Sequence, residues 1–271
     1  MKKTRAFLKW AGGKYGLIED IQQQLPEGDL LVEPFVGAAS VFLNTDYPRY
    51  LLSDINPDLI NMYQLLQQRP QQFIDDAKHY FTQECNQSEY YYQVRKRFNA
   101  TKDSYQRSLM FLYMNRHGYN GLCRYNRGGG FNVPFGSYKR PYFPEQELEF
   151  FAEKSHKAEF RCCSYVETFA EVKAGDIVYC DPPYAPLSPT ASFTNYASKG
   201  FNRSDQERLG DLAIEAQQRG ASVLISNHDL PLTRSIYQHS ELSKLSVRRT
   251  ISRKGQQRMK VAELLAYYQA N

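Results

Sequence analysis

The chain has 271 residues, 23% of them charged and 42% hydrophobic, and its 34 Lys and Arg outnumber its 29 Asp and Glu by five. This composition is typical of a soluble globular protein with a full core, and no apolar run approaches the ~20 residues that a membrane-spanning helix needs. The basic N-terminus runs directly into Trp10 and a glycine pair, so it lacks a secretory signal and predicts a cytoplasmic protein. Five cysteines without CxxC spacing favour reduced, structural thiols and no metal site.

The positive charge is concentrated in two blocks. Residues 95–140 hold ten Lys and Arg against one acid, and residues 244–260 hold seven with no acid, so the rest of the chain is acidic. The first block also carries nine Phe and Tyr. Aromatic side chains interleaved with basic ones favour a nucleic-acid partner over an ordinary solvated face.

A glycine pair followed by Lys14 is the first chemical motif. Such a turn can bring backbone N–H groups and one ammonium against an anion. The GxxxxGK[ST] spacing of a phosphate-binding loop is absent, so the motif does not predict an ATPase.

A strand over residues 29–33, a turn of small residues and a helix come next. Ser40 is expected to cap that helix. Strand, turn and helix together form the cofactor corner of a nucleotide-binding βαβ unit.

The following strand, residues 50–53, ends at Asp54, which lies 21 residues after Glu33. An acid at about this spacing commonly accepts hydrogen bonds from ribose hydroxyls. Capping the next helix is the alternative role for Asp54.

Residues 57–116 show helical periodicity with no strand signal, in four segments, and predict a helical insertion. The irregular stretch 117–140 follows, rich in glycine, aromatic residues and arginine, and it predicts a loop or hairpin.

The chain then returns to the sheet. A helix from residue 145 to about 158 and a strand over 159–163 lead to Ser164 and Tyr165. The apolar strand 176–180 is followed by Asp181-Pro182-Pro183-Tyr184, where two prolines forbid both helix and ladder and the chain must turn outward.

The last third continues the same alternation. Residues 186–200 are expected to form a loop long enough to move, and Ser204 to cap a helix that reaches about residue 218. A strand over 221–226 and an antiparallel pair, 242–251 with 261–268, complete the predicted sheet.

Four strand ends therefore carry polar or turn residues: Glu33, Asp54, Ser164 and Asp181. Open α/β sheets bind small molecules at this rim, so the four outline a ligand cleft. A dehydrogenase is disfavoured because no GxGxxG motif is present.

Three long motifs carry a family resemblance: residues 7–14 (FLKWAGGK), residues 115–126 (NRHGYNGLCRYN) and the DPPY tetrad 181–184. Together with Phe35-x-Gly37 they resemble the α-group amino-methyltransferases, and most closely the GATC-specific DNA adenine N6-methyltransferases of the Dam family. One departure is Ala39, which stands where the family has the second glycine of its cofactor turn.

The resemblance implies an α/β fold: a Rossmann-like S-adenosylmethionine-dependent methyltransferase sheet with an inserted, mainly helical DNA-recognition domain. It divides the chain into a catalytic and cofactor-binding domain, residues 1–56 and 145–271, and a target-recognition domain, residues 57–144, with hairpin loop 117–140. It also implies transfer of the methyl group of S-adenosylmethionine to N6 of an adenine flipped out of GATC.

The implied site residues fall into three groups. Catalytic roles go to Asp181, Pro182 and Tyr184, and an ordinarily ionised aspartate suffices. Cofactor binding is assigned to Trp10, Ala11, Gly12, Lys14, Glu33, Pro34, Phe35, Gly37, Asp54, Ile55, Ser164, Tyr165 and Asp181, with Lys14 suited to the methionine carboxylate. DNA binding is assigned to Lys9, Arg95, Arg116, Tyr119, Asn120, Leu122, Arg124, Asn126, Pro134, Ser137, Tyr138, Lys139 and Arg140.

The expected partner is double-stranded DNA, bound by a functional monomer acting on the chromosome in the cytoplasm, without metal or membrane. Two alternatives stay open. One is an N6-adenine methyltransferase of another DNA sequence or of RNA, and the other is a catalytically inactive DNA-binding protein. An Asn in place of Asp181 would instead be typical of protein glutamine methylation.

Overall fold

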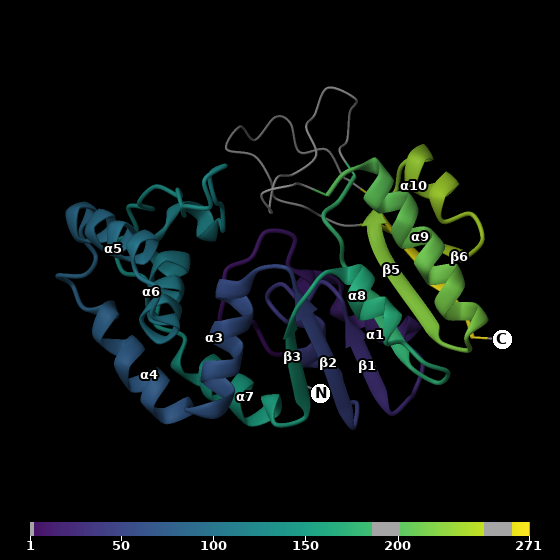
Figure 1. The fold of residues 1–271 in the computed structure, drawn as a ribbon, viewed down its shortest axis with the longest axis horizontal. Coiled ribbons are helices and arrows are strands. Elements are labelled where there is room, and N and C mark those ends of the chain that lie inside the picture. Colours follow the sequence, from purple (N-terminus) through teal and green to yellow (C-terminus); the bar gives the residue numbers. More distant parts are fainter. Residues whose placement is uncertain (1–2, 186–200, 247–261, 271) are drawn as a thin grey trace.

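A computed structural model describes residues 3–185, 201–246 and 262–270. One seven-stranded sheet runs through it, in the order β3-β2-β1-β4-β5-β7-β6 (Figure 1). The strands are β1 (Leu30–Glu33), β2 (Arg49–Asp54), β3 (Ala158–Cys162), β4 (Ile177–Cys180), β5 (Ser222–His228), β6 (Glu241–Ser246) and β7 (Ala262–Tyr268). The strands β1 to β5 are parallel, whereas β7 runs antiparallel to both β5 and β6. The strand order reverses between β1 and β4, the place where open α/β sheets bind ligands.

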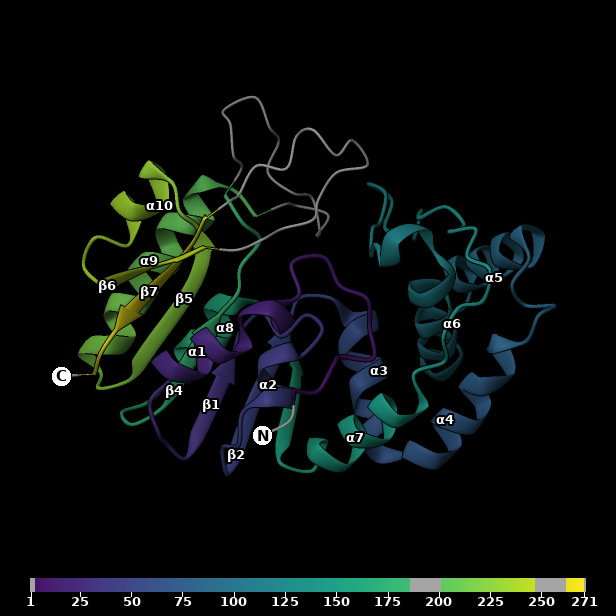
Figure 2. The ribbon, with the colours of Figure 1, turned by 180° about the vertical axis from the view of Figure 1, so that it is seen from behind.

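Helices cover both faces of the sheet, with α8 and α9 in front in Figure 1 and α1 and α2 in front in Figure 2. The α-helices are α1 (Ile18–Gln24), α2 (Ser40–Asn44), α3 (Pro57–Gln68), α4 (Pro70–Lys78), α5 (Ser88–Ala100), α6 (Ser104–His117), α7 (Glu145–Ser155), α8 (Tyr165–Ala170), α9 (Arg203–Gln218) and α10 (Pro231–Ile236). The 3-10 helices are η1 (Lys14–Leu17), η2 (His79–Phe81) and η3 (Tyr119–Gly121).

The strand β4 shows why the sheet is buried on both sides. All four of its residues are buried, and they alternate between two core clusters. Ile177 and Tyr179 face the cluster under α1, α2 and α3, while Val178 and Cys180 face the cluster under α8 and α9. Successive side chains of a strand point to opposite faces, so a short, wholly apolar run fits a central parallel strand.

The helices α4, α5 and α6 form a lobe beyond the β3 edge of the sheet, at the opposite end from β6 (Figures 1 and 2). This lobe is tied to the sheet, because its buried residues belong to the same cluster as Leu31 of β1 and Tyr50 and Leu52 of β2. The predicted helical insertion is therefore confirmed as secondary structure. Its division from the rest as a separate domain stays a prediction.

Residues 117–140, called here the basic hairpin, contain η3 and two isolated antiparallel bridges, Gly118 with Phe135 and Tyr125 with Phe131. In Figure 1 they lie at the top of the helical lobe, on the same side as the carboxyl ends of the parallel strands. The predicted hairpin is thus an irregular, bridged loop.

The strands and long helices predicted from the sequence are confirmed, with differences at caps and ends. Asn202, not Ser204, caps α9, and Asn56, not Asp54, caps α3, because each asparagine side chain accepts two backbone N–H groups of the following turn. The helix α7 ends at Ser155, and α1 and α10 were not predicted. The expected mobile loop 186–200 and the basic turn between β6 and β7 lie outside the described residues.

Ala39 replaces Ser40 as the residue that precedes the first turn of α2. Its backbone is left-handed, with φ 59° and ψ 31°, and its side chain is fully buried. A non-glycine residue adopts this conformation at a cost of about 1–2 kcal/mol. Glycine would avoid that cost but would lose backbone entropy on folding and one buried methyl group.

We expect the opposing terms to leave the free energy of unfolding of Ala39→Gly within about 1 kcal/mol of the wild type. Ala39→Val should lower it by roughly 2 kcal/mol or more, because a β-branched side chain is both strained and overpacked there. Urea unfolding of the two variants measures the difference. Wild-type stability in Ala39→Val would contradict the left-handed turn.

Candidate active site

The candidate site lies at the carboxyl ends of β1 and β4, on either side of the point where the strand order reverses. Glu33 ends β1 and Asp181 directly follows β4. Two neighbouring strands add Asp54, at the end of β2, and Ser226, near the end of β5. Ser164 follows β3. The four strand ends predicted from the sequence, Glu33, Asp54, Ser164 and Asp181, are thus brought to one rim, and Ser226 joins them.

Asp181 is held from two sides. The ammonium of Lys14 lies 2.6 Å from its Oδ1, and the Ser226 hydroxyl donates to the same oxygen at 3.3 Å. Burial raises the pKa of Asp181 above its ordinary value, and Lys14 and Ser226 oppose that rise. This differs from the ordinary ionisation expected from the sequence: the carboxylate form depends on the lysine beside it.

Lys14 is only 3% exposed. Its ammonium also donates to the Gly12 carbonyl at 2.7 Å and lies 4.7 Å from the centre of the Tyr184 ring. The family resemblance suits Lys14 to the methionine carboxylate of the cofactor, whereas in this structure its ammonium is paired with Asp181. A buried ammonium needs a counter-charge, and Asp181 is the carboxylate within reach.

The plane of the Tyr184 ring is fixed at its far edge. Its hydroxyl donates to Glu263 Oε2 at 3.0 Å, and its ring meets that of His228 edge-on, with centroids 4.6 Å apart. Glu263 lies on β7 and His228 at the end of β5, where the two are register partners. The antiparallel end of the sheet therefore positions the aromatic group of the tetrad.

Glu33 is 2% exposed, and its Oε1 has no hydrogen-bond partner among the described residues. Burial is the main cause that raises its pKa to about 8, with a smaller contribution from Asp181. The raised pKa favours the protonated, neutral form of Glu33. A buried carboxyl oxygen without a partner is suited to accept a hydrogen bond from a bound ligand.

The cofactor corner is built around Asp54. Its two oxygens accept the backbone N–H groups of Gly37, at 3.2 Å, and Asn56, at 3.0 Å. Gly37 has a positive φ of 45°, and a Cβ there would stand 2.9 Å from Trp10 Nε1. Only glycine lets the turn approach Trp10 so closely.

An apolar wall stands beside these polar groups. Phe35 stacks on Tyr165 with centroids 5.4 Å apart, and both rings contact Phe201 edge-on. Ile55, directly after Asp54, is 59% exposed, which is unusual for so large an apolar side chain. A carboxylate next to a partly open aromatic and aliphatic wall fits a nucleoside, with the sugar on the acid and the base on the wall.

The remaining predicted cofactor residues have other surroundings. Ser164 uses its hydroxyl in a capping box with Glu167, at the start of α8. Pro34 is buried, whereas Ala11 and Gly12 are exposed.

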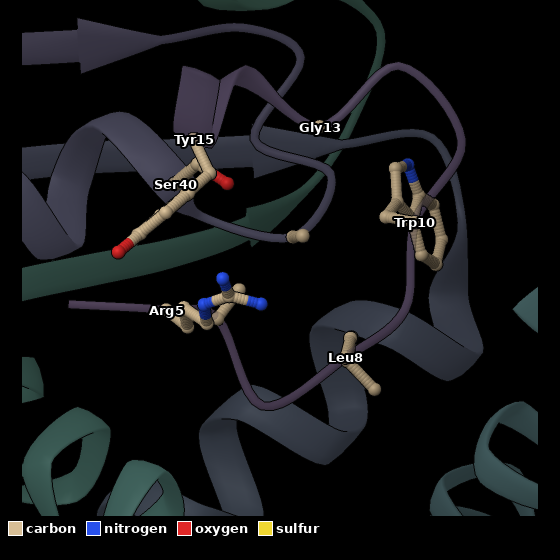
Figure 3. Close-up of a pocket in the computed structure, with 8 residues that line it drawn as sticks. Arg5, Leu8, Trp10, Gly13, Tyr15 and Ser40 are labelled. Carbon is tan, nitrogen blue, oxygen red and sulfur yellow. The ribbon is translucent and has the colours of Figure 1, made fainter. Parts of the chain in front are cut away.

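A cavity of about 200 Å³ lies beside the cofactor turn (Figure 3). It is lined by Arg5, Ala6, Leu8, Trp10, Gly13, Tyr15, Ala38 and Ser40. In Figure 3 the Arg5 guanidinium points into the space between the N-terminal segment and the turn before α2. Trp10 is the one predicted cofactor residue among those eight, so the cavity adjoins the rim that carries the acids.

Several basic residues predicted to bind DNA are engaged inside the protein. Arg116 is 9% exposed and donates to the carbonyls of Tyr142 and Phe7 at 3.2 Å each. Arg95 donates to the Val133 carbonyl at 2.9 Å. Arg116 therefore links the N-terminal segment to residue 142 inside the protein. To contact a phosphate, its guanidinium would have to break these hydrogen bonds.

Lys9 bridges the N-terminal segment and the basic hairpin. Its ammonium donates to the Arg116 carbonyl at 3.2 Å and lies 3.9 Å from the centre of the Tyr138 ring. Burial and the nearby Arg116 charge lower its pKa to about 8. Tyr138 in turn accepts the Asn120 N–H at 2.9 Å.

The tip of the hairpin is exposed and shaped by its own hydrogen bonds. Arg124 donates through Nε to Asn132 Oδ1 at 2.8 Å, which orients its guanidinium. Asn126 Oδ1 accepts two backbone N–H groups of the glycine turn. Asn120 and Ser137 have left-handed backbones. The other predicted contacts, Tyr119, Leu122, Pro134, Lys139 and Arg140, are partly or fully exposed.

The hairpin is fastened to the cofactor corner. The Asn56 amide contacts Cys123 Sγ at 3.5 Å, and the Tyr125 hydroxyl donates to Asp58 Oδ2 at 2.7 Å. Arg107 of α6 binds the same Asp58 through two nitrogens, at 2.8 and 3.0 Å. The exposed hairpin is therefore mounted on the start of α3, four residues from Asp54.

Sequence reasoning missed Ser226 and Glu263. Ser226 follows the pattern that identified the other strand ends, because polar residues 226–228 end an apolar strand. Glu263 lacks such a signal, since nothing local distinguishes it from a surface residue.

Within the described ranges, no group of three or more His, Cys, Asp or Glu side chains is arranged to hold a metal ion. No helix of those ranges is both long and apolar enough to cross a membrane.

Comparison with known proteins gives one consistent result. Residues 10–251 match the family described as D12 class N6 adenine-specific DNA methyltransferase. A DNA adenine methylase of Vibrio cholerae serotype O1 is 63% identical over 269 residues, which span 99% of this chain and 97% of that protein. The DNA adenine methylase of Serratia marcescens is 57% identical over 99% of this chain and all of that protein, and that of Escherichia coli K12 is 55% identical over 99% and 96%.

Proposed function

The chain belongs to the D12 class of N6 adenine-specific DNA methyltransferases, and from that premise we propose that it methylates the adenine of GATC in double-stranded DNA. The observation that carries the proposal is the tetrad at the β4 rim, mounted beside a nucleoside-shaped corner and facing the same side as a basic hairpin. The relatives named DNA adenine methylase support the DNA substrate.

S-adenosylmethionine is the methyl donor, and its sulfonium supplies an already activated methyl group. Asp54 would hold the ribose, the wall of Phe35, Tyr165 and Ile55 the adenine, and the loop of Trp10 to Lys14 the methionine end. S-adenosylmethionine carries several hydrogen-bond donors, one of which could bind the unpaired Oε1 of Glu33.

The tetrad is proposed to make adenine N6 a better nucleophile. The lone pair of adenine N6 is delocalised into the ring, so N6 attacks poorly. Asp181 and the Pro182 carbonyl can each accept one N6–H bond, which favours a tetrahedral nitrogen and stabilises the positive charge that develops there. The Lys14 ammonium favours the accepting, ionised form of Asp181.

Tyr184 supplies the surface for the base. Its anchored hydroxyl and the edge contact with His228 hold the ring ready, so little conformational freedom is lost when an adenine stacks on it. A base at this rim has left the duplex, and Tyr119 and Asn120 of the hairpin are placed to fill the gap.

The basic hairpin would read the sequence. Arg124 is assigned to a guanine edge, Leu122 and Pro134 to a thymine methyl, and Lys9 to the outer guanine. Exposed Lys139 and Arg140 are assigned to phosphates, with Asn126, Ser137 and Tyr138 shaping the backbone that presents them. One chain holds all these parts, which supports a functional monomer.

Digestion of treated DNA with methylation-sensitive nucleases tests the proposal. A duplex containing GATC should become protected against a nuclease that requires unmethylated GATC, and a matched duplex with GATT should take up no labelled methyl group. Methylation of both duplexes, or of RNA alone, would replace the GATC assignment. Specific DNA binding without methyl transfer would identify an inactive DNA-binding protein.

Substitutions of Arg124 and Lys139 should have different effects on DNA binding. Arg124→Ala should cost about 1–3 kcal/mol of discrimination at one guanine, because a two-pronged base contact is lost. Lys139→Ala should weaken binding to all DNA equally and reduce the salt dependence by about one phosphate contact. Competition binding to GATC and single-base variants at several salt concentrations separates the two, and a base-specific loss at Lys139 would reverse the assignment.

A further inference from the structure

Three fully buried polar side chains form a hydrogen-bonded network, and two of them bind the backbone on either side of Tyr184. They are Gln206 from the first turn of α9, Asn227 from β5 and Tyr237 just after α10. These elements lie side by side at one end of the sheet (Figures 1 and 2). Burying polar groups is costly unless each is paired, so their partners are informative.

Gln206 fixes the carbonyl before Tyr184. Its Nε2 donates to the Pro183 carbonyl at 2.8 Å. Its Oε1 accepts from Asn227 Nδ2 at 2.9 Å and from the Tyr237 hydroxyl at 2.8 Å. The atom next to the Pro183 carbonyl must be a donor, so only this orientation of the Gln206 amide, with Nε2 toward that carbonyl, satisfies its hydrogen bonds.

Asn227 fixes the residue after Tyr184. Since its Nδ2 is committed to Gln206, its Oδ1 accepts, and it takes the Ala185 N–H at 3.2 Å and the His228 N–H at 2.9 Å. His228 Nδ1 lies 2.8 Å from the Ala185 carbonyl. The backbone is therefore gripped on both sides of Tyr184 by one connected network.

The grip omits one group. Within the described ranges no donor lies on the Pro182 carbonyl, while the polar backbone groups of Pro183 and Ala185 are all paired. Pro182 is the carbonyl to which the mechanism assigns an N6–H bond. The network therefore fixes the backbone of Pro183 and Ala185 and leaves the Pro182 carbonyl available to the substrate.

We propose that Gln206 and Asn227 are positioning residues for methyl transfer: they hold the Pro183–Ala185 backbone so that the Pro182 carbonyl and Asp181 meet the N6 hydrogens together. The inference rests on the proposed roles of Asp181 and Pro182. Misplacement of a reacting group by about 1 Å can cost about 100-fold in rate, so loss of the grip should appear in the chemical step.

The test compares Gln206→Met with Tyr237→Phe. Gln206→Met keeps the side-chain volume and removes the bond to Pro183 together with those to Asn227 and Tyr237. Tyr237→Phe removes hydrogen bonds of the same network but none to a tetrad atom. Both should lower the melting temperature. Gln206→Met should lower the single-turnover rate at saturating cofactor and DNA roughly 10–100-fold, with KM for S-adenosylmethionine nearly unchanged, and Tyr237→Phe should stay near the wild-type rate.

Gln206→Glu adds a readout that stability alone would not move. An ionised carboxylate accepts from Asn227 and Tyr237 but cannot donate to the Pro183 carbonyl, whereas the protonated acid can. The rate of Gln206→Glu relative to Gln206→Met should therefore rise as the pH falls, and the ratio cancels the titration of Asp181 that both variants share.

A wild-type single-turnover rate in Gln206→Met would overturn the inference, as would an equal rate loss in Tyr237→Phe. Asp181→Ala is assayed alongside. If it stays active, the assigned roles of the tetrad fail. If it is inactive while the Gln206 variants react at the wild-type rate, only the positioning role fails.

Discussion

Asp181→Ala should reduce the single-turnover rate of methyl transfer by more than about 100-fold, the loss typical of removing one preorganised group from a transition state. The variant loses the proposed N6–H acceptor and leaves the Lys14 ammonium buried beside Tyr184 without its counter-charge. Stopped assays of labelled methyl transfer into duplex DNA at saturating cofactor measure the rate.

Asp176→Ala is the matched control, because Asp176 lies just before the same strand and its carboxylate accepts a local N–H, from Lys173. It should retain most of the rate. DNA binding by Asp181→Ala should also persist, since the basic hairpin makes no contact with Asp181. An Asp181→Ala enzyme that keeps a tenth of the wild-type rate would remove Asp181 from the mechanism.

Glu33→Gln should stabilise the protein, and the gain should grow with pH. Burial raises the pKa of Glu33 from 4.5 to about 8. Between those pH values the folded state binds a proton that the unfolded state lacks, so stability falls by up to about 1.4 kcal/mol per pH unit. Glutamine mimics the protonated acid and escapes this loss, which amounts to about 3 kcal/mol at pH 7.

Urea unfolding at pH 4.5, 6 and 7.5 measures the effect, with Glu27→Gln, an exposed acid before the same strand, as the control. The Glu33→Gln curve should coincide with the wild type at the lowest pH and separate from it as the pH rises. A constant difference across the range would show that Glu33 is ionised in the folded protein. If Glu33 also serves the cofactor, the stabilised variant should bind S-adenosylmethionine more weakly.

The order of strands and helices follows from local patterns, which is why it could be predicted. Four consecutive apolar residues before Asp181 leave little choice but a central strand, and two prolines force the exit. The candidate rim was predictable for the same reason, since strand ends are visible in the sequence and parallel strands share an edge.

The pairing of side chains at that rim was not predictable. Lys14 and Asp181 are far apart in the chain, and no periodicity links a lysine after two glycines to a particular carboxylate. The same holds for Glu263, which an alternating strand pattern places on one face without naming its partner. Local patterns fix which side of an element a residue occupies, whereas the partner depends on how elements meet.

The surroundings of Arg116 could not be read from the sequence. Arg116 lies in the most basic block of the chain, and the family resemblance assigned it to DNA binding. The structure shows it buried, holding the carbonyls of Phe7 and Tyr142. A long guanidinium side chain can serve either purpose, and only the path of the neighbouring backbone decides between them.

The anchoring of Tyr184 on Glu263 has a consequence for biosynthesis. Chains emerge from the ribosome N-terminus first, so the helical lobe and the basic hairpin can fold long before residue 263 is made. The bond from the Tyr184 hydroxyl to Glu263 forms only when β7 inserts between β5 and β6. A nascent chain therefore completes the basic hairpin, which is proposed to bind DNA, before the strand that carries the Glu263 partner of the proposed catalytic tetrad is made.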